Sequence, residues 1–151
     1  MLTAAAAPLD RDAIARLVPH AGVMSLLDRA LSWDDEGIAC EADRHRDPAN
    51  PLRRDGRLPA ICGVEYALQA MALHGALLAP GGAAAQPAGY LSSLRDVSLG
   101  AERLDTVAGP LGIRARALAA ETGGFIYRFE VEGEARTLLT GQAAIILPRR
   151  P

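Results

Sequence analysis

The sequence predicts an α+β fold in which one antiparallel sheet wraps around a single long helix. Three observations predict it. Residues 60–79 form a nearly continuous apolar segment that is too long for a strand, β-compatible segments separated by glycine-rich turns follow it, and a hairpin-like segment precedes it. A helix that is apolar on nearly every side must be covered by protein on most sides. A sheet with one face toward the helix and one toward water provides that cover.

The chain opens with a predicted short helix over Asp10–Leu17. Asp10 or Asp12 is placed to cap its first turn, and Pro19 ends it because proline cannot continue the backbone hydrogen bonds.

A hairpin follows the first helix. Residues 24–33 are apolar and β-compatible, residues 34–37 have the composition of a turn, and residues 38–42 alternate as a strand does. Residues 44–58 are polar and contain two prolines and a glycine, which predicts a long loop. Long ordered loops in compact domains are often functional.

Pro59 stands where a proline is tolerated, at the first turn of the long helix. The helix is predicted from about Ala60 to about Ala79, and Pro80-Gly81-Gly82 ends it. Small residues then form a flexible segment over 81–86. No second domain is indicated, so residues 1–151 are predicted to be one domain.

The remainder of the chain predicts strands connected by tight turns at residues 121–124 and 132–134. Alternation is clearest in Phe125–Val131, where apolar and polar residues take turns. The predicted strands are residues 88–98, 111–121, 125–132 and 135–147.

Composition excludes some classes of partner. The net charge is only −2, and the 16 basic residues, all arginine, are spread along the chain without a basic run. We therefore expect no nucleic-acid partner. Cys40 and Cys62 form no recognisable pattern, which favours small buried side chains in a reducing compartment.

The long apolar segment is not predicted to span a membrane. Glu65, Gln69 and His74 interrupt it, and it contains two glycines. A spanning helix seldom accepts that mixture. The N-terminal residues carry no basic region of the kind that opens a secretory signal. We therefore expect a cytoplasmic protein.

Glu65 is the main catalytic candidate. It stands six residues into the long helix, between Val64 and Tyr66. Burial there would disfavour the charged form of the carboxyl group, as a general acid requires. Gln69 lies four residues further on and shares its helix face. The alternative is that both side chains point at water through a gap in the sheet.

The start of the helix is the second candidate site. The amides of Ala60, Ile61, Cys62 and Gly63 lack partners within the helix and carry the positive end of its dipole. A thioester carbonyl placed there would be polarised, and an enolate formed from it would be stabilised. The alternative is an ordinary capped helix start.

The chain has three histidines that are candidate bases. His45 lies in the long loop that leads into the Glu65 helix, His20 follows Pro19, and His74 lies on another face of the helix. A single histidine is more often structural than catalytic. None has the spacing from cysteine or carboxylate that a metal site needs, so no metal is predicted.

Two segments resemble the FabA/FabZ family of 3-hydroxyacyl-[acyl-carrier-protein] dehydratases. Residues 59–70, Pro-Ala-Ile-Cys-Gly-Val-Glu-Tyr-Ala-Leu-Gln-Ala, are similar to the family's helix. Residues 17–20 and 24–29 are similar to its leucine-proline-histidine and aspartate-arginine segments. Residues 50–53 followed by 63–66 look most like the dehydratase-like subfamily of aryl polyene-type synthases. The order of strands agrees, so the resemblance covers nearly the whole chain.

The resemblance implies a hot-dog fold, a dimer or a hetero-oligomer with another hot-dog subunit, and a site between protomers. Glu65 would be the acid that protonates the departing 3-hydroxyl, and a histidine would remove the α-proton. The substrate would arrive on phosphopantetheine, carried by acyl carrier protein or coenzyme A, without a metal or redox cofactor. Implied substrate-binding residues are Ala60, Ile61, Gly63, Gln69 and His20.

One departure from the family pattern concerns the base. The family's catalytic histidine lies fourteen residues before the acid, and that position is Pro51 here. Either His45 reaches the site by another loop path or the base is missing. The glycine after the helix-opening proline is also replaced, by Ala60.

Three functions therefore stay open. The first is dehydration of 3-hydroxyacyl thioesters, with Glu65 as acid and His45 as base. The second is a non-catalytic, acyl-binding subunit of a hetero-oligomeric dehydratase. The third is a thioesterase, which can use a helix carboxylate without histidine and so accounts most simply for Pro51.

Overall fold

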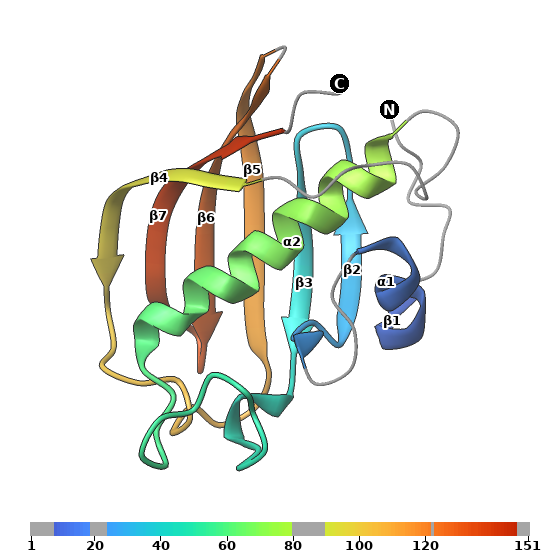
Figure 1. The fold of residues 1–151 in the computed structure, drawn as a ribbon. Helices are drawn as coiled ribbons and strands as arrows, with labels where there is room; N and C mark the ends of the chain where they lie inside the picture. The colour runs from blue at the N-terminus through green and yellow to red at the C-terminus, as the bar shows by residue number, and fades with distance from the viewer. Residues whose placement is uncertain (1–7, 19–23, 80–89, 122, 148–151) are drawn as a thin grey trace.

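A computed structural model describes residues 8–18, 24–79, 90–121 and 123–147. Within these residues, one seven-stranded antiparallel sheet curves around one long helix, α2 (Figure 1). The strand order is β1-β2-β3-β5-β6-β7-β4. The elements are β1 Leu9–Asp10, α1 Arg11–Leu17, β2 Arg29–Trp33, β3 Gly37–Ala42, α2 Gly63–Leu78, β4 Tyr90–Leu99, β5 Leu111–Glu121, β6 Gly124–Gly133 and β7 Arg136–Ile146, with short 3₁₀ helices η2 Arg44–Arg46 and η3 Ala60–Cys62.

The N-terminal half follows the predicted order. Asp10 caps α1 by accepting a hydrogen bond from the Ala13 amide at 2.9 Å. The β2–β3 turn is held by Asp34, whose carboxylate accepts from the amides of Glu36 and Gly37. Only residues 29–33 of the predicted first strand are β-structure. The sequence also gave no sign of β1, which is two residues long.

The C-terminal half agrees more closely, and β5 has the predicted bounds. The turn after β6 differs in its centre, because Gly133 pairs with Arg136 and the two residues between them make the turn. These are Glu134 and Ala135, with φ of 52° and 59°. Residues other than glycine rarely adopt such backbone angles, so this turn is strained.

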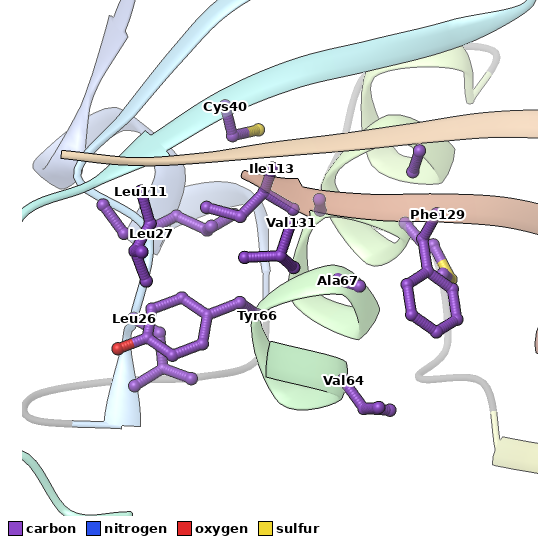
Figure 2. Packing of buried hydrophobic residues seen from close by; sticks show 14 of the residues in the cluster. Leu26, Leu27, Cys40, Val64, Tyr66, Ala67, Leu111, Ile113, Phe129 and Val131 are labelled. Carbon is purple, nitrogen blue, oxygen red and sulfur yellow. The ribbon is translucent and has the colours of Figure 1, made fainter. Parts of the chain in front are cut away.

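The core lies between α2 and the inner face of the sheet. Tyr66 is fully buried, and Figure 2 shows its ring among Leu26, Leu27 and Leu111. Every second residue of β3 is buried, from Ile38 to Ala42, which is the alternation of a sheet with one covered face.

The residues of η3 and α2, Ala60–Leu78, are long and apolar enough to cross a membrane by length and composition. This stretch instead packs as the core helix, with ten of the α2 residues buried against the protein. Its apolar surface is therefore accounted for within the fold, as predicted. Three predicted features lie outside the described residues: Pro19 and His20, the end of the helix at Pro80, and the small-residue segment 81–86.

Candidate functional site

Glu65 lies in the first turn of α2, and its side chain is exposed. The expectation that it is buried in this chain was wrong. It lies at the start of the helix, where no described segment covers it, and it has no hydrogen bond or ion pair with another described residue. A carboxyl group in this position is open to a ligand or to another chain.

Cys62 lies close to Glu65 at the helix start. It is half-buried, and its thiol sulfur is 3.9 Å from the Leu52 carbonyl oxygen. Burial raises the pKa of the Cys62 thiol, and the Glu65 carboxylate raises it further. The Arg54 guanidinium acts in the opposite direction. Glu65, Cys62 and Arg54 therefore form one neighbourhood at the helix start.

The amides of the helix start are largely occupied, which differs from the expectation of a free donor set. The Ala60 amide donates to the Glu102 carbonyl at 3.0 Å, and the Cys62 amide donates to the Pro59 carbonyl at 3.0 Å. The Gly63 amide donates to the Ala60 and Ile61 carbonyls. Of these four amides, only that of Ile61 has no hydrogen-bond partner among the described residues. Ile61 as a residue is 47% exposed.

Gly63 has a packing reason that the sequence did not reveal. A Cβ there would lie 2.7 Å from a Leu139 methyl and 3.4 Å from a Val131 methyl. Those distances are too short for a side chain at this position, so the glycine lets α2 begin directly on β6 and β7.

Gln69 is buried and joins α2 to the segment before β2. Its Oε1 accepts from the Leu26 amide at 2.9 Å, and its Nε2 donates to the Met24 carbonyl at 2.7 Å. Both ends of the amide are thus engaged within the protein. Gln69 was predicted to bind substrate together with Glu65, but the Met24–Leu26 segment covers it while Glu65 stays exposed.

His45 is 1% exposed and belongs to η2 in the long loop. Its Nε2 lies 2.9 Å from the Val107 carbonyl oxygen, which only accepts, so this nitrogen carries the proton. Its Nδ1 is buried without a partner. The ring therefore anchors the loop inside the protein, whereas the Glu65 carboxyl is exposed, and the role of His45 as a base stays a prediction.

Pro51, at the position of the family's histidine, follows a buried residue that organises the loop. Asn50 donates to the Tyr66 hydroxyl at 3.0 Å and to the Arg44 carbonyl at 3.1 Å, and accepts from the Leu52 amide at 2.9 Å. Burial raises the pKa of the Tyr66 hydroxyl. A cavity of only about 40 Å³ adjoins Pro51, which is too small for an acyl group.

Asp105 is a positioning residue that sequence reasoning missed. Its carboxylate accepts from the Leu58 amide at 2.9 Å and pairs with Arg103, and it faces Arg53 at 3.5 Å. The Arg103 guanidinium holds the pKa of this carboxyl well below its usual range. Because Leu58 comes just before η3, Asp105 fixes the place where the Glu65 helix begins.

His74 is also internal. Its Nε2 lies 2.7 Å from the Asp34 carbonyl oxygen and its Nδ1 lies 2.8 Å from the Tyr127 hydroxyl. The first contact requires a proton on Nε2, so the Tyr127 hydroxyl donates to Nδ1. Within the described part of the chain, no group of three His, Cys, Asp or Glu side chains is placed to hold a metal ion.

The fold and this helix define a class, the hot-dog proteins, in which a curved antiparallel sheet surrounds one central helix. The chain belongs to the ApeP-like family, whose model, described as ApeP dehydratase, matches residues 12–151. The family supports a dehydratase role, and the structural neighbours support the hot-dog fold.

Solved structures agree with the fold. The dehydratase heterocomplex ApeI:P from Xenorhabdus doucetiae contains a chain that is 22% identical, with a TM-score of 0.74 and 91% of each chain covered. Thioesterase PA1618 (Q49A mutant) from Pseudomonas aeruginosa is 15% identical, with a TM-score of 0.56 over 80% of this chain and 81% of that one. Thioesterase HI1161 from Haemophilus influenzae is 11% identical, with a TM-score of 0.58 over 80% and 78%. The comparison with curated proteins gives no match.

Proposed function

We propose that this chain is one subunit of a hot-dog dehydratase that converts 3-hydroxyacyl thioesters to trans-2-enoyl thioesters. In this proposal Glu65 is the acid, and a second hot-dog subunit supplies the base. The observation that carries the proposal is the position of Glu65: it is exposed at the end of the helix that lies beside an open edge of the sheet.

That open edge is β4. It pairs with β7 on one side and with no described strand on the other, and all ten of its residues are exposed. Leu94, Val97 and Leu99 are 38%, 37% and 52% exposed. An edge strand with free hydrogen-bonding groups and exposed apolar side chains is suited to pair with another chain.

The edge and Glu65 adjoin one another. Leu99 of β4 pairs with Leu139 of β7, and Leu139 limits the space at Gly63, two residues before Glu65. Figure 1 shows the start of α2 on the side of the sheet where β7 and β4 lie. A chain that docked on β4 would therefore also cover the start of α2. It would shield the Glu65 carboxyl from water.

The heterocomplex of dehydratase subunits among the structural neighbours supports a different hot-dog chain as this partner rather than a second copy. Both ring nitrogens of His74 and the Nε2 of His45 make internal contacts, the Nδ1 of His45 is buried, and Pro51 cannot exchange a proton. A base from the partner accounts for these features together.

The chemistry divides between the two groups. The partner's base takes the proton from C2 while protonated Glu65 gives its proton to the 3-hydroxyl, which leaves as water. The C2–H and C3–O bonds break, the C2–C3 double bond forms, and no oxidation state changes overall. The amide of Ile61, an exposed residue, would donate to the thioester oxygen as negative charge develops there.

The proposed substrate arrives on phosphopantetheine from acyl carrier protein or coenzyme A, in cytoplasmic fatty-acid or polyene lipid biosynthesis, and needs no separate cofactor. This chain would be assayed alone and together with a hot-dog subunit that retains the family's histidine loop. A 3-hydroxyacyl thioester and a saturated acyl thioester serve as substrates. We expect enoyl absorbance from the two subunits together and none from this chain alone.

Two other outcomes contradict the proposal. Thiol release from the saturated thioester by this chain alone would identify a thioesterase. Full enoyl formation by the partner alone, unchanged when this chain is added, would give this chain no part in the chemistry.

A further inference from the structure

A row of arginines crosses the outer face of the sheet, opposite α2. Arg116 of β5 pairs directly with Arg128 of β6, Arg128 pairs with Gln142 of β7, and Gln142 pairs with Arg95 of β4. Residues that pair directly across strands project from the same face. These four residues are called the arginine row below. It runs along the strand order seen in Figure 1.

The three arginines of this row are exposed, and none has an ion pair with a described residue. Neighbouring strands are about 4.8 Å apart, so Arg116 and Arg95 are separated by roughly 14 Å across three strand spacings. Like charges directly opposite each other destabilise a sheet. The Arg116–Arg128 pair is therefore unfavourable for folding alone.

The next row of the sheet is different. Arg114 lies opposite Glu130 and 3.6 Å from Glu132, so its charge is compensated locally. On the side of β3, Gly37 pairs with Arg116 and presents no side chain above the sheet. Gly37, Arg116 and Arg128 line an open groove of about 1130 Å³. A narrow line of arginines without an ion pair to a described residue thus runs beside a groove whose lining also includes Glu36 and Glu130.

The charge pattern indicates the kind of occupant. A membrane surface or a nucleic acid would lie over several rows at once, and would meet the carboxylates of Glu36, Glu130 and Glu132 around the arginine row. An acidic protein segment in extended conformation, only one strand wide, would contact the row while meeting those carboxylates less than a broad surface does. Guanidinium groups bind carboxylates in a bidentate manner, which suits glutamate and aspartate side chains.

We propose that the arginine row docks an acidic segment of a partner protein. This surface is on the opposite face of the sheet from Glu65, and the inference does not depend on the proposed dehydration. It differs as well from the β4 edge, because it uses side chains that project from the face and not the free backbone of the edge strand.

The test measures binding of a fluorescein-labelled extended peptide with glutamate at every second position, by fluorescence anisotropy. The full chain is compared with the double variant Arg116→Gln/Arg128→Gln and with the control Arg136→Gln. Arg136 is an exposed arginine on β7 outside the row. We expect the double variant to weaken binding about tenfold or more and the control to change it less than about twofold.

Equal losses in the double variant and the control would overturn the proposal, because net charge alone would then explain binding. Absence of binding to wild type at about 1 mM peptide would also overturn it. Tighter, row-dependent binding to phosphatidylglycerol vesicles or duplex DNA, or row-dependent self-association in sedimentation, would contradict the acidic protein segment as occupant. Melting curves check folding, and removing two opposed charges should not lower the melting temperature.

Discussion

Polar side chains in the middle of α2 differ from the one at its start in burial and in hydrogen bonding. Gln69 and His74 are buried, and each makes two hydrogen bonds to atoms of other elements. Glu65, one turn before Gln69, is exposed and makes neither a hydrogen bond nor an ion pair with a described residue. The polar side chains in the middle of the helix are thus paired within one chain, whereas the Glu65 side chain would gain a partner from a ligand or another subunit.

The largest stability effect is expected at Gln69. Gln69→Ala leaves the buried Leu26 amide and the partly buried Met24 carbonyl without their partner. An unpaired buried group costs about 1–3 kcal/mol and the partly buried carbonyl costs less, so we expect a loss of about 2–4 kcal/mol in the free energy of unfolding. Urea denaturation measures it. A loss of stability no larger than that caused by Glu65→Ala would contradict the contrast between the middle and the start of the helix.

Asp105, which fixes the start of the helix, makes a contribution to stability that depends on pH. Its folded pKa is depressed by Arg103, so its stabilising contribution is complete above the unfolded value of about 3.9 and is lost as pH falls below it. Asp105→Asn should lower the free energy of unfolding by about 1–3 kcal/mol at pH 6. The difference from wild type should shrink by pH 3, and a constant difference at both values would refute this account.

His45 tests whether buried polar groups in the loop are structural. His45→Gln should reduce stability by about 1 kcal/mol, because the contact with the Val107 carbonyl is changed. Activity of the two-subunit complex should stay within about threefold of wild type, since the proposed base comes from the partner. A loss of about 100-fold or more in a folded variant, the effect typical of a removed general base, would restore His45 as the base.

The smallest effect is expected at the β6–β7 turn. Ala135 has φ of 59°, which glycine adopts without a steric penalty. Ala135→Gly should raise the free energy of unfolding by about 0.5–1 kcal/mol. Ala119→Gly, an exposed β5 position, is the control and should lower it. Thermal denaturation of both variants checks the sign.

The sequence predicted the fold well because alternation and apolar helix content depend on local residues. The strand Leu111–Glu121 and the Asp10 cap both follow from such patterns. The site was harder to predict, because burial depends on contacts between distant segments. The 43-residue separation between Gln69 and Leu26 left no signal in the helix itself.

Two residues that matter for the site, Asp105 and Asn50, were not predicted from the sequence. Asp105 lies 47 residues from the Leu58 amide that it holds, and nothing near it in the sequence marks that contact. Asn50 stands beside Pro51 in a loop expected to be functional, so its position gave a signal. The contact of its amide with the Tyr66 hydroxyl, which lies on the helix, has no local signal in the loop.

The most direct test of the central claim is the rate of enoyl formation by the two-subunit complex carrying Glu65→Gln in this chain. The substitution keeps the side-chain shape at an exposed position, so folding and assembly should be unchanged. We predict that the rate falls by about 100-fold or more, as expected for loss of a general acid. An unchanged rate in the assembled complex would contradict the assignment of Glu65 as the acid.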